Sequence, residues 1–390
     1  MQTKLRAIGF PVLCGVILTA ARSPAADDDW VGQRVMLKEN AKPKIGARSL
    51  QWSDVSLPAA VEKVEGDWLW IGTAWVKKSD ALRLDDAPDY YTQLIARGDD
   101  EQRAVGYLLR GATWLTKREF DNAIKDLSEV IRLSPDSAPI YIARGKAYHA
   151  KHRYDQAMAD FNEAIRLNPT NLVAYNDRGC TWTSKGDYSK AERQFDEVLR
   201  RAPDNALAFA NRGTNWFKQD EYDKALADLT RAVKLDPKLS FAYSNRGRVY
   251  MKLGDYLKAM ADYDKAIAIA PHEWPAYNGR ARILATAPDF EYHLRDGKKA
   301  VEVAKQACEF SEWDEWIAIA TLAAAYAEAG DFESALKWHA KAMEMSQPAE
   351  DRDQRDNEKR LALYKAGKPY HEDVAAQAAR EDPAPEERVP

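Results

Sequence analysis

Small and apolar side chains recur along most of the chain at a fixed interval. An Arg-Gly pair repeats every 34 residues, at Arg110-Gly111, Arg144-Gly145, Arg178-Gly179, Arg212-Gly213 and Arg246-Gly247. Two further positions keep the same register, with alanine at Ala123, Ala157, Ala191, Ala225 and Ala259, and proline at Pro135, Pro169, Pro203, Pro237 and Pro271. A repeat at a fixed period of this length is typical of an array of stacked structural units.

Each interval contains the pattern of two amphipathic helices. In the interval that begins at Ala138, the large–small–large series Tyr141, Gly145 and Tyr148 predicts the first helix. A second apolar series, spaced by four and three residues, predicts the second helix at Ala157, Phe161 and Ala164. Pro169 lacks an amide hydrogen and ends that helix. One such hairpin cannot bury its own apolar face, so stacked neighbours are expected to supply the core.

This pattern resembles the tetratricopeptide repeat (TPR) family, whose period is also 34 residues. The resemblance predicts a mainly α fold, an α–α superhelical solenoid. Five regular repeats are expected over residues 104–273, a stretched sixth over 274–315 and a seventh over 316–348. In the sixth repeat the second helix is centred on Ala300 and Ala304, seven residues later than the period requires.

The segments after the repeats have a different composition. Residues 349–370 are rich in charge but retain Leu361, Leu363 and Tyr364, which predicts a helix that caps the last apolar face. Residues 371–390 combine three prolines with acids and alanines, which predicts a disordered tail.

The residues before the repeats do not follow a helical period. Over 30–84, short runs of branched and aromatic residues alternate with turn residues such as Gly66 and Gly72, which predicts a small all-β barrel. The segments 66–71 and 74–80 resemble bacterial SH3-like domains. The acidic-aromatic loop that serves proline recognition in other SH3 domains is not found here. Residues 85–103 are expected to form a helix that links the barrel to the repeats.

The N-terminus has the order of a secretory signal peptide. Lys4 and Arg6 precede an apolar stretch from Ala7 to Ala21, and small residues stand before Ala26. Residues 1–25 are therefore expected to be removed, which leaves a chain without a membrane span that acts outside the cytoplasm, in the periplasm or another extracytoplasmic compartment. The formal net charge of −4 gives no reason to expect a nucleic-acid partner.

Candidate sites for catalysis and for metals are not apparent. No nucleophile elbow, phosphate-binding loop or zinc motif occurs, and His149 and His152 lack the further ligands that a metal site needs. The protein is therefore expected to be no enzyme and to carry no cofactor. Cys180 and Cys308 lie several repeats apart and are expected to be free thiols.

The arginines of the Arg-Gly series have two interpretations. They lie on the first helix of each repeat, and the second helix carries an acid or amide at Asp126, Asp160, Gln194, Asp228 and Asp262. The arginines either form a ladder of anion-binding sites or pair with these side chains between adjacent helices. Structural contacts, unlike ligand sites, are expected in every repeat.

The resemblance implies that the first helices line a concave groove that binds an extended peptide or protein. The groove-facing candidates for peptide binding are Asn176, Asp177, Asn211, Asn245, Arg248, Asn278 and Arg282. An amide side chain both donates and accepts, so it matches a peptide unit; the alternative is that these polar residues are merely solvated. The chain lacks the lysines with which chaperone-binding members clamp a terminal carboxylate.

On the predicted barrel, Trp68 and Trp70 share one face of a strand, opposite Leu69 and Ile71. This aromatic patch is expected either to bind a ligand or to dock the barrel onto the repeats. The leading interpretation of the whole chain is a non-enzymatic interaction scaffold. Two alternatives remain open: an envelope-attachment module whose barrel binds cell-wall peptide, and an accessory subunit of an exported enzyme.

Overall fold

A computed structural model of the chain describes residues 30–45, 48–49, 55–288, 293–346 and 351–372. The predicted signal peptide, residues 1–25, and the residues of the predicted tail beyond Glu372 lie outside the described residues. The chain divides after Arg201 into two compact units, which are described separately below.

Within the described residues, the first unit opens with eight short strands in two antiparallel sheets. The strands are β1 (Arg34–Leu37), β2 (Lys44–Ile45), β3 (Arg48–Ser49), β4 (Ala59–Ala60), β5 (Lys63–Glu65), β6 (Trp68–Trp70), β7 (Trp75–Lys77) and β8 (Ala81–Arg83). The orders are β4-β1-β8 and β3-β2-β7-β6-β5. Leu69 and Ile71 enter the shared apolar core, together with Val35, Leu37 and Val76.

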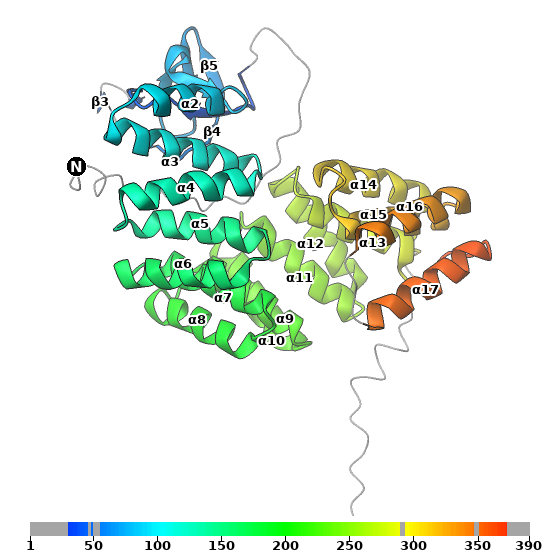
Figure 1. The fold of residues 1–390 in the computed structure, drawn as a ribbon. Helices are drawn as coiled ribbons and strands as arrows, with labels where there is room; N and C mark the ends of the chain where they lie inside the picture. The colour runs from blue at the N-terminus through cyan, green and yellow to red at the C-terminus, as the bar shows by residue number, and fades with distance from the viewer. Residues whose placement is uncertain (1–29, 46–47, 50–54, 289–292, 347–350, 373–390) are drawn as a thin grey trace, which may run out of the picture. The chain divides into compact units, whose positions relative to one another are not determined.

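Seven helices follow in the first unit and stack as antiparallel neighbours, with the strands beside α2 (Figure 1). They are α2 (Ala87–Arg97), α3 (Asp100–Thr116), α4 (Phe120–Leu133), α5 (Ala138–Ala150), α6 (Tyr154–Leu167), α7 (Leu172–Ser184) and α8 (Tyr188–Arg201). Asp99 caps α3 reciprocally with Gln102, which separates α3 from α2. The segment expected to be a linker thus contains all of α2 and the start of α3.

An apolar contact joins the strands to the first helices. Met36 and Leu82 pack with Tyr91 of α2 and with Leu109 and Ala112 of α3. The Tyr91 hydroxyl donates to the carbonyl oxygen of Leu37 over 2.7 Å, which satisfies the polar end of a buried ring. The three-stranded sheet is therefore attached to the helices through β1 and β8.

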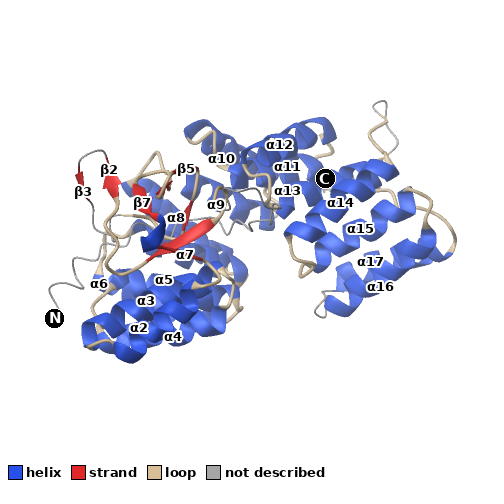
Figure 2. Ribbon diagram, turned by 90° about the horizontal axis from the view of Figure 1, so that it is seen from above, coloured by secondary structure: helices blue, strands red, loops and turns tan. Residues whose placement is uncertain are grey.

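The second unit continues the helical array. Its helices are α9 (Ala206–Lys218), α10 (Tyr222–Leu235), α11 (Ser240–Lys252), α12 (Tyr256–Ile269), α13 (Trp274–Thr286), α14 (Gly297–Phe310), α15 (Trp316–Glu328), α16 (Phe332–Met345) and α17 (Asp351–Lys365). Helices α14, α15 and α16 pack as successive neighbours (Figure 2), and α17 packs against α16. The chain is thus mainly α, a solenoid of helical hairpins that follows a small β region.

Glycines on the first helices allow close helix packing. A β-carbon at Gly247 would lie 2.9 Å from the ring of Tyr263, and one at Gly279 would lie 2.2 Å from the same ring. Tyr263 is consequently held between the two helices α11 and α13. The sequence alternates large and small residues because the ring of Tyr263 packs directly against the backbone at Gly247 and at Gly279.

The sixth repeat departs from the period at its second helix. Repetition of the period from Tyr256, where α12 begins, would start the next second helix at residue 290, whereas α14 begins at Gly297. In the connection, Arg295 pairs with Glu328 of α15 at 3.0 Å and donates to the carbonyl oxygen of Ala287. Asp296 caps α14 by accepting from the backbone N–H of Lys299.

The last helix covers an apolar face that the preceding hairpin leaves. Tyr364 of α17 is fully buried against Ala323, Ala327 and Ala335. Gly367 then adopts a φ of +65°, and Lys368 donates to the carbonyl oxygen of Leu363. This left-handed turn ends α17 and redirects the chain.

Candidate functional site

The arginines of the Arg-Gly series are structural links within repeats. In four of the five pairs, Nε and Nη2 each donate to a carboxylate oxygen of the second helix over 2.7–2.8 Å, at Arg110–Asp126, Arg144–Asp160, Arg212–Asp228 and Arg246–Asp262. In the remaining pair Arg178 donates to the neutral Gln194. These two-point contacts favour the interpretation of the series as helix–helix pairs rather than anion sites.

The same arginines also contact the helix before them. Nη1 of Arg144 donates to Ser128, and Nη1 of Arg178 donates to Asn162. In the stretched repeat Arg280 instead pairs with Asp264 of the preceding helix, at 2.9 Å. The late arrival of α14 accounts for this change, because the position that would supply the acid belongs to the connection.

Two candidate peptide-binding residues lie on α7 in the first unit. Asn176 is buried, and Asp177 forms an ion pair with Lys146 of α5 at 3.3 Å. Burial raises the pKa of Asp177, although Lys146 opposes that shift. Burial, with Asp177 nearby, also raises the pKa of Cys180 to about 12, so this free thiol stays protonated.

The candidate asparagines of the second unit are also buried. Asn211 lies on α9 and Asn245 on α11. The Asn245 amide donates to the carbonyl oxygen of Phe241 and accepts from Nη1 of Arg248. Both ends of this amide are therefore engaged within its own helix. Peptide binding by these two residues stays a prediction.

Arg248 and Arg282 lie close together on the first helices α11 and α13. Arg248 is exposed, and its guanidinium lies 4.8 Å from the centre of the Phe217 ring. Desolvation of the guanidinium by the groups around it, together with the charge of Arg282, lowers the pKa of Arg248. Among the described residues no carboxylate lies within ion-pair distance of Arg248.

Arg282 binds a residue from the far end of the chain. Nε and Nη2 of Arg282 lie 2.7 and 2.6 Å from Oε1 of Glu372. The Glu372 backbone N–H donates to the carbonyl oxygen of Thr286 over 2.8 Å, and the hydroxyls of Thr286 and Tyr256 lie at 3.3 and 3.4 Å from its carboxylate. The side chain of Glu372 is 9% exposed and that of Arg282 is 38% exposed.

The electrostatics of this contact favour the ionised carboxylate. Burial alone raises the pKa of Glu372, but Arg282, with Arg360 and Lys252, outweighs burial and lowers it overall. Glu372 in turn raises the pKa of Arg282. The ion pair is a charge-assisted contact to the side chain of Glu372, and the Thr286 carbonyl oxygen binds the backbone N–H of the same residue.

The residues before Glu372 run from α17 to α13, and they contact both the repeat helix α15 and the capping helix α17. His371 Nε2 lies 2.7 Å from Oε2 of Glu328, and Arg295 donates to the other oxygen of the same carboxylate, Oε1. The Tyr370 ring lies 4.6 Å from the guanidinium of Arg360. His371 and Glu372 thus depart from the disorder expected for residues 371–390, because specific charged partners hold them.

Sequence reasoning placed Arg282 on the groove through its register but did not find Glu372, Thr286 or Tyr256. Glu372 is ninety residues from Arg282 and belongs to no repeat, so no periodic signal pairs the two. The remaining candidate, Asn278, lies one turn before Arg282 on α13. Its Oδ1 is buried and has no hydrogen-bond partner among the described residues.

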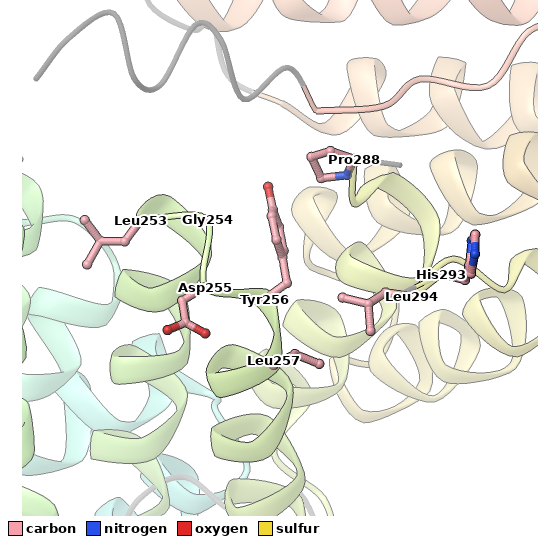
Figure 3. A pocket seen from close by; sticks show the side chains of 8 residues that line it. All are labelled: Leu253, Gly254, Asp255, Tyr256, Leu257, Pro288, His293 and Leu294. Atoms are coloured by element: carbon pink, nitrogen blue, oxygen red, sulfur yellow. The ribbon is translucent and has the colours of Figure 1, made fainter. Parts of the chain in front are cut away.

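A pocket of about 350 Å³ lies next to this contact. Its lining includes Tyr256, Pro288 and three leucines, Leu253, Leu257 and Leu294. Figure 3 shows the Tyr256 ring rising from the start of α12 toward Pro288. Because the Tyr256 hydroxyl reaches Glu372, the pocket and the carboxylate contact share one side chain.

The aromatic patch of the strands is half-buried. Two ammonium groups lie near the Trp68 ring, that of Lys44 at 5.3 Å and that of Lys77 at 5.7 Å from its centre. The rings of Trp70 and Trp75 are 5.5 Å apart. The described apolar cluster that joins strands to helices contains neither Trp68 nor Trp70. Ligand binding and docking of the barrel both stay predictions for this patch.

The described residues lack a membrane-spanning helix and a metal-binding cluster. No helix there has the length and apolar character to cross a membrane. No group of three or more His, Cys, Asp or Glu side chains there is arranged to hold a metal ion.

Comparisons with known proteins identify the repeats. Three tetratricopeptide repeat models match the chain, one over residues 138–171 and 240–273, one over 184–240 and one over 318–348. A search of curated proteins found no match.

Solved structures with a similar fold include a chain of the APC/C hetero-tetramer Cut9–Hcn1 and yeast Tom70. The TM-scores are 0.55 and 0.53, at 15% and 17% identity, and the matches cover 71% and 77% of this chain. They span 52% of the Cut9–Hcn1 chain and 60% of Tom70. A tetratricopeptide repeat protein from Parabacteroides merdae matches over 68% of this chain and 99% of its own, at 16% identity and a TM-score of 0.47. Family models and helical geometry together lead to one conclusion: the solenoid of this chain is built from tetratricopeptide repeats.

Proposed function

We propose that this chain is a non-enzymatic interaction scaffold that acts outside the cytoplasm and binds an extended peptide of a partner protein along the first helices of its repeats. The TPR fold supports a role in protein–protein interaction. The observation that carries the peptide mode is the seating of Glu372 on α13, where a backbone N–H and a carboxylate of an irregular segment are bound at once. Recognition of a separate peptide uses the same two elements, main-chain bonds for affinity and a charged side chain for specificity.

The extracytoplasmic location is part of this proposal. It rests on the signal-like order of residues 1–25 and on no observation of the described residues.

Site-specific photo-crosslinking in the native organism tests the scaffold function. A photo-reactive residue in place of Arg248 of α11 is expected to form an adduct with a partner in the exported fraction. The same residue in place of Lys265, exposed on the second helix α12, is the matched control and is expected to form no such adduct. Equal yields of adduct from positions 248 and 265 would contradict the proposal. An adduct from position 248 that forms only in the cytoplasm would also contradict it.

A second candidate function concerns the strands. The Trp68 ring, with two lysines near it, combines an aromatic face with positive charge, which suits a carboxylate-bearing peptide such as one from the cell wall. Co-sedimentation of the full chain with purified wall material checks this, with Trp68→Ala as the variant that should lose binding. Retention of full binding by Trp68→Ala would exclude the patch. The accessory-subunit alternative has no supporting contact in the described residues.

A further inference from the structure

Residues 371–372 bind where a partner peptide would bind. Arg282 was placed on the peptide-binding face by its position in the repeat, and in the structure its guanidinium holds the carboxylate of Glu372. Thr286, one turn further along α13, supplies both a backbone acceptor and a hydroxyl to the same residue. The contact therefore has the features of a ligand in a site rather than those of a helix packed on a helix.

We propose that the segment ending in Glu372 is an intramolecular ligand that a partner must displace, and that the partner segment is an extended acidic peptide. This inference rests on the proposed scaffold function and names the chemistry of its ligand. Arg282 receives a carboxylate of the partner in place of Glu372, and the Thr286 carbonyl oxygen receives a backbone N–H of the partner.

The charge around the site exceeds what the segment neutralises. Arg248, Arg282 and Arg360 all act on this region, whereas Glu372 supplies one carboxylate. Arg248 has no carboxylate partner among the described residues. A peptide with a second acid would pair with Arg248, so an acidic partner gains a contact that the chain's own segment does not make.

Two polar atoms beside the arginines also lack partners among the described residues. They are Oγ of Ser244 and Oδ1 of Asn278, both buried. Ser244 precedes Arg248 by four residues and Asn278 precedes Arg282 by four, so each lies one turn along the same helix face. Both atoms are shielded from solvent, so a peptide that continues past Arg282 in that direction would reach them only as the side chains over them move aside; its backbone would then remove the cost of leaving them unpaired.

The pocket beside Tyr256 adds an apolar requirement. Leu253 and Leu257 are exposed, and with Leu294 and Pro288 they line a cavity large enough for one large apolar side chain (Figure 3). Displacement of Glu372 frees the Tyr256 hydroxyl at the edge of this pocket. The ligand class is therefore an extended peptide with one or two acidic residues close to an apolar one.

A competing explanation is that the segment only fastens α17 to α13. A peptide-binding assay separates the two explanations. The probe is a fluorescent synthetic peptide with the sequence of residues 368–373, Lys-Pro-Tyr-His-Glu-Asp, blocked at both ends. Its affinity is measured for the full chain and for Glu372→Lys, which places a positive charge against Arg282. We expect Glu372→Lys to bind the probe at least tenfold more tightly, as follows when a site that is nine-tenths occupied becomes free.

Three controls make the result specific. Glu344→Lys changes an exposed glutamate of α16 and should leave probe affinity unchanged. A probe with glutamine in place of its glutamate should bind Glu372→Lys weakly. The charge-swapped chain Arg282→Glu with Glu372→Lys restores an ion pair, so it should melt near the wild-type temperature yet not bind the acidic probe.

Equal probe affinity for the wild-type chain and Glu372→Lys, with both chains folded by circular dichroism, would overturn the inference. This outcome differs from failure of the scaffold function. If the crosslinking adduct at position 248 forms while the probe result is negative, the scaffold stands and the intramolecular ligand does not. If the probe binds Glu372→Lys but no adduct forms in the organism, the site stands and the scaffold function does not.

Discussion

At the residue scale, the repeats are held by a charged contact as much as by apolar packing. Asp160 is buried, and its two oxygens are bonded by Nε and Nη2 of Arg144. Burial raises the pKa of Asp160, although Arg144 opposes that shift. A buried carboxylate of this kind contributes little net stability while paired, but it is costly once its partner is removed.

The first prediction compares two arginines of the same register. Arg144→Met leaves the charged Asp160 buried without its partner, so the free energy of unfolding should fall by about 3–5 kcal/mol. Arg178→Met leaves the neutral, half-buried Gln194, and the loss should be about 0.5–1.5 kcal/mol. Urea denaturation of both variants measures the difference. Equal losses would mean that the carboxylate's charge does not decide the cost.

The candidate asparagines show why a side chain's role is hard to assign from register alone. The period places Asn245 on the first-helix face, and the structure puts it there, but the amide bonds Phe241 and Arg248. Period gives the face of a helix, whereas the bonds that a side chain makes depend on its rotamer and neighbours. Arg282, by contrast, reaches away from its helix and meets Glu372.

At the element scale, the two ends of the array are closed in different ways. The first end has α2, with Tyr91 packed between the strands and α3. The other end has α17, whose Tyr364 is buried on α15 and α16. A repeat array needs such terminal elements because an uncovered repeat exposes an apolar face.

The second prediction tests α17 as a cap. Tyr364→Ala removes a ring that is 1% exposed, and truncation of a buried aromatic side chain should lower stability by about 3–5 kcal/mol. Hydrogen exchange should accelerate in α15–α17 and not in the first unit, because coupling in repeat arrays is between neighbours.

Tyr364→Phe is the matched control for this prediction. The buried hydroxyl has no hydrogen-bond partner among the described residues, so its removal should leave stability unchanged or slightly higher. Destabilisation of Tyr364→Phe as large as that of Tyr364→Ala would show that the hydroxyl, rather than the ring, holds the cap.

Elements differed in how well the sequence predicted them. The helices follow from a period repeated many times, so even the seven-residue delay of α14 is visible in the sequence. The strands are shorter and lack a repeat. Alternation put Leu69 and Ile71 on the face opposite Trp68 and Trp70, and both lie in the apolar core, but no local pattern marks strands as short as β2 and β3. Two- and three-residue strands are held by pairing across the sheet, which leaves little local pattern.

At the scale of the whole molecule, the chain combines a strand module, a repeat array and a segment that returns to the array. Composition identified the C-terminal residues as a tail because they are polar, acidic and rich in proline. A single residue of that segment, Glu372, nevertheless binds Arg282. A composition averaged over a window of residues cannot reveal one such contact. The site is therefore a property of the folded second unit.

The third prediction concerns processing of the whole chain. We expect the natural protein to begin at Ala26, because small residues at positions 23 and 25 match the requirement of signal peptidase. N-terminal sequencing of the protein purified from its source measures this. Ala25→Leu should accumulate as the longer precursor, and Ala26→Ser should be processed normally. An intact N-terminus on wild-type protein in the cytoplasm would rule out export.

The turn at Gly367 has a consequence for how strongly a partner must bind. Because α17 anchors the segment and only four residues lie between Gly367 and Glu372, the carboxylate meets Arg282 as part of the same molecule. Short tethers of this kind give effective concentrations in the millimolar range. A single acidic peptide in solution competes against that concentration at all times. Peptides of low affinity consequently fail to displace Glu372. A partner that carries several copies of its segment is favoured over a single free peptide.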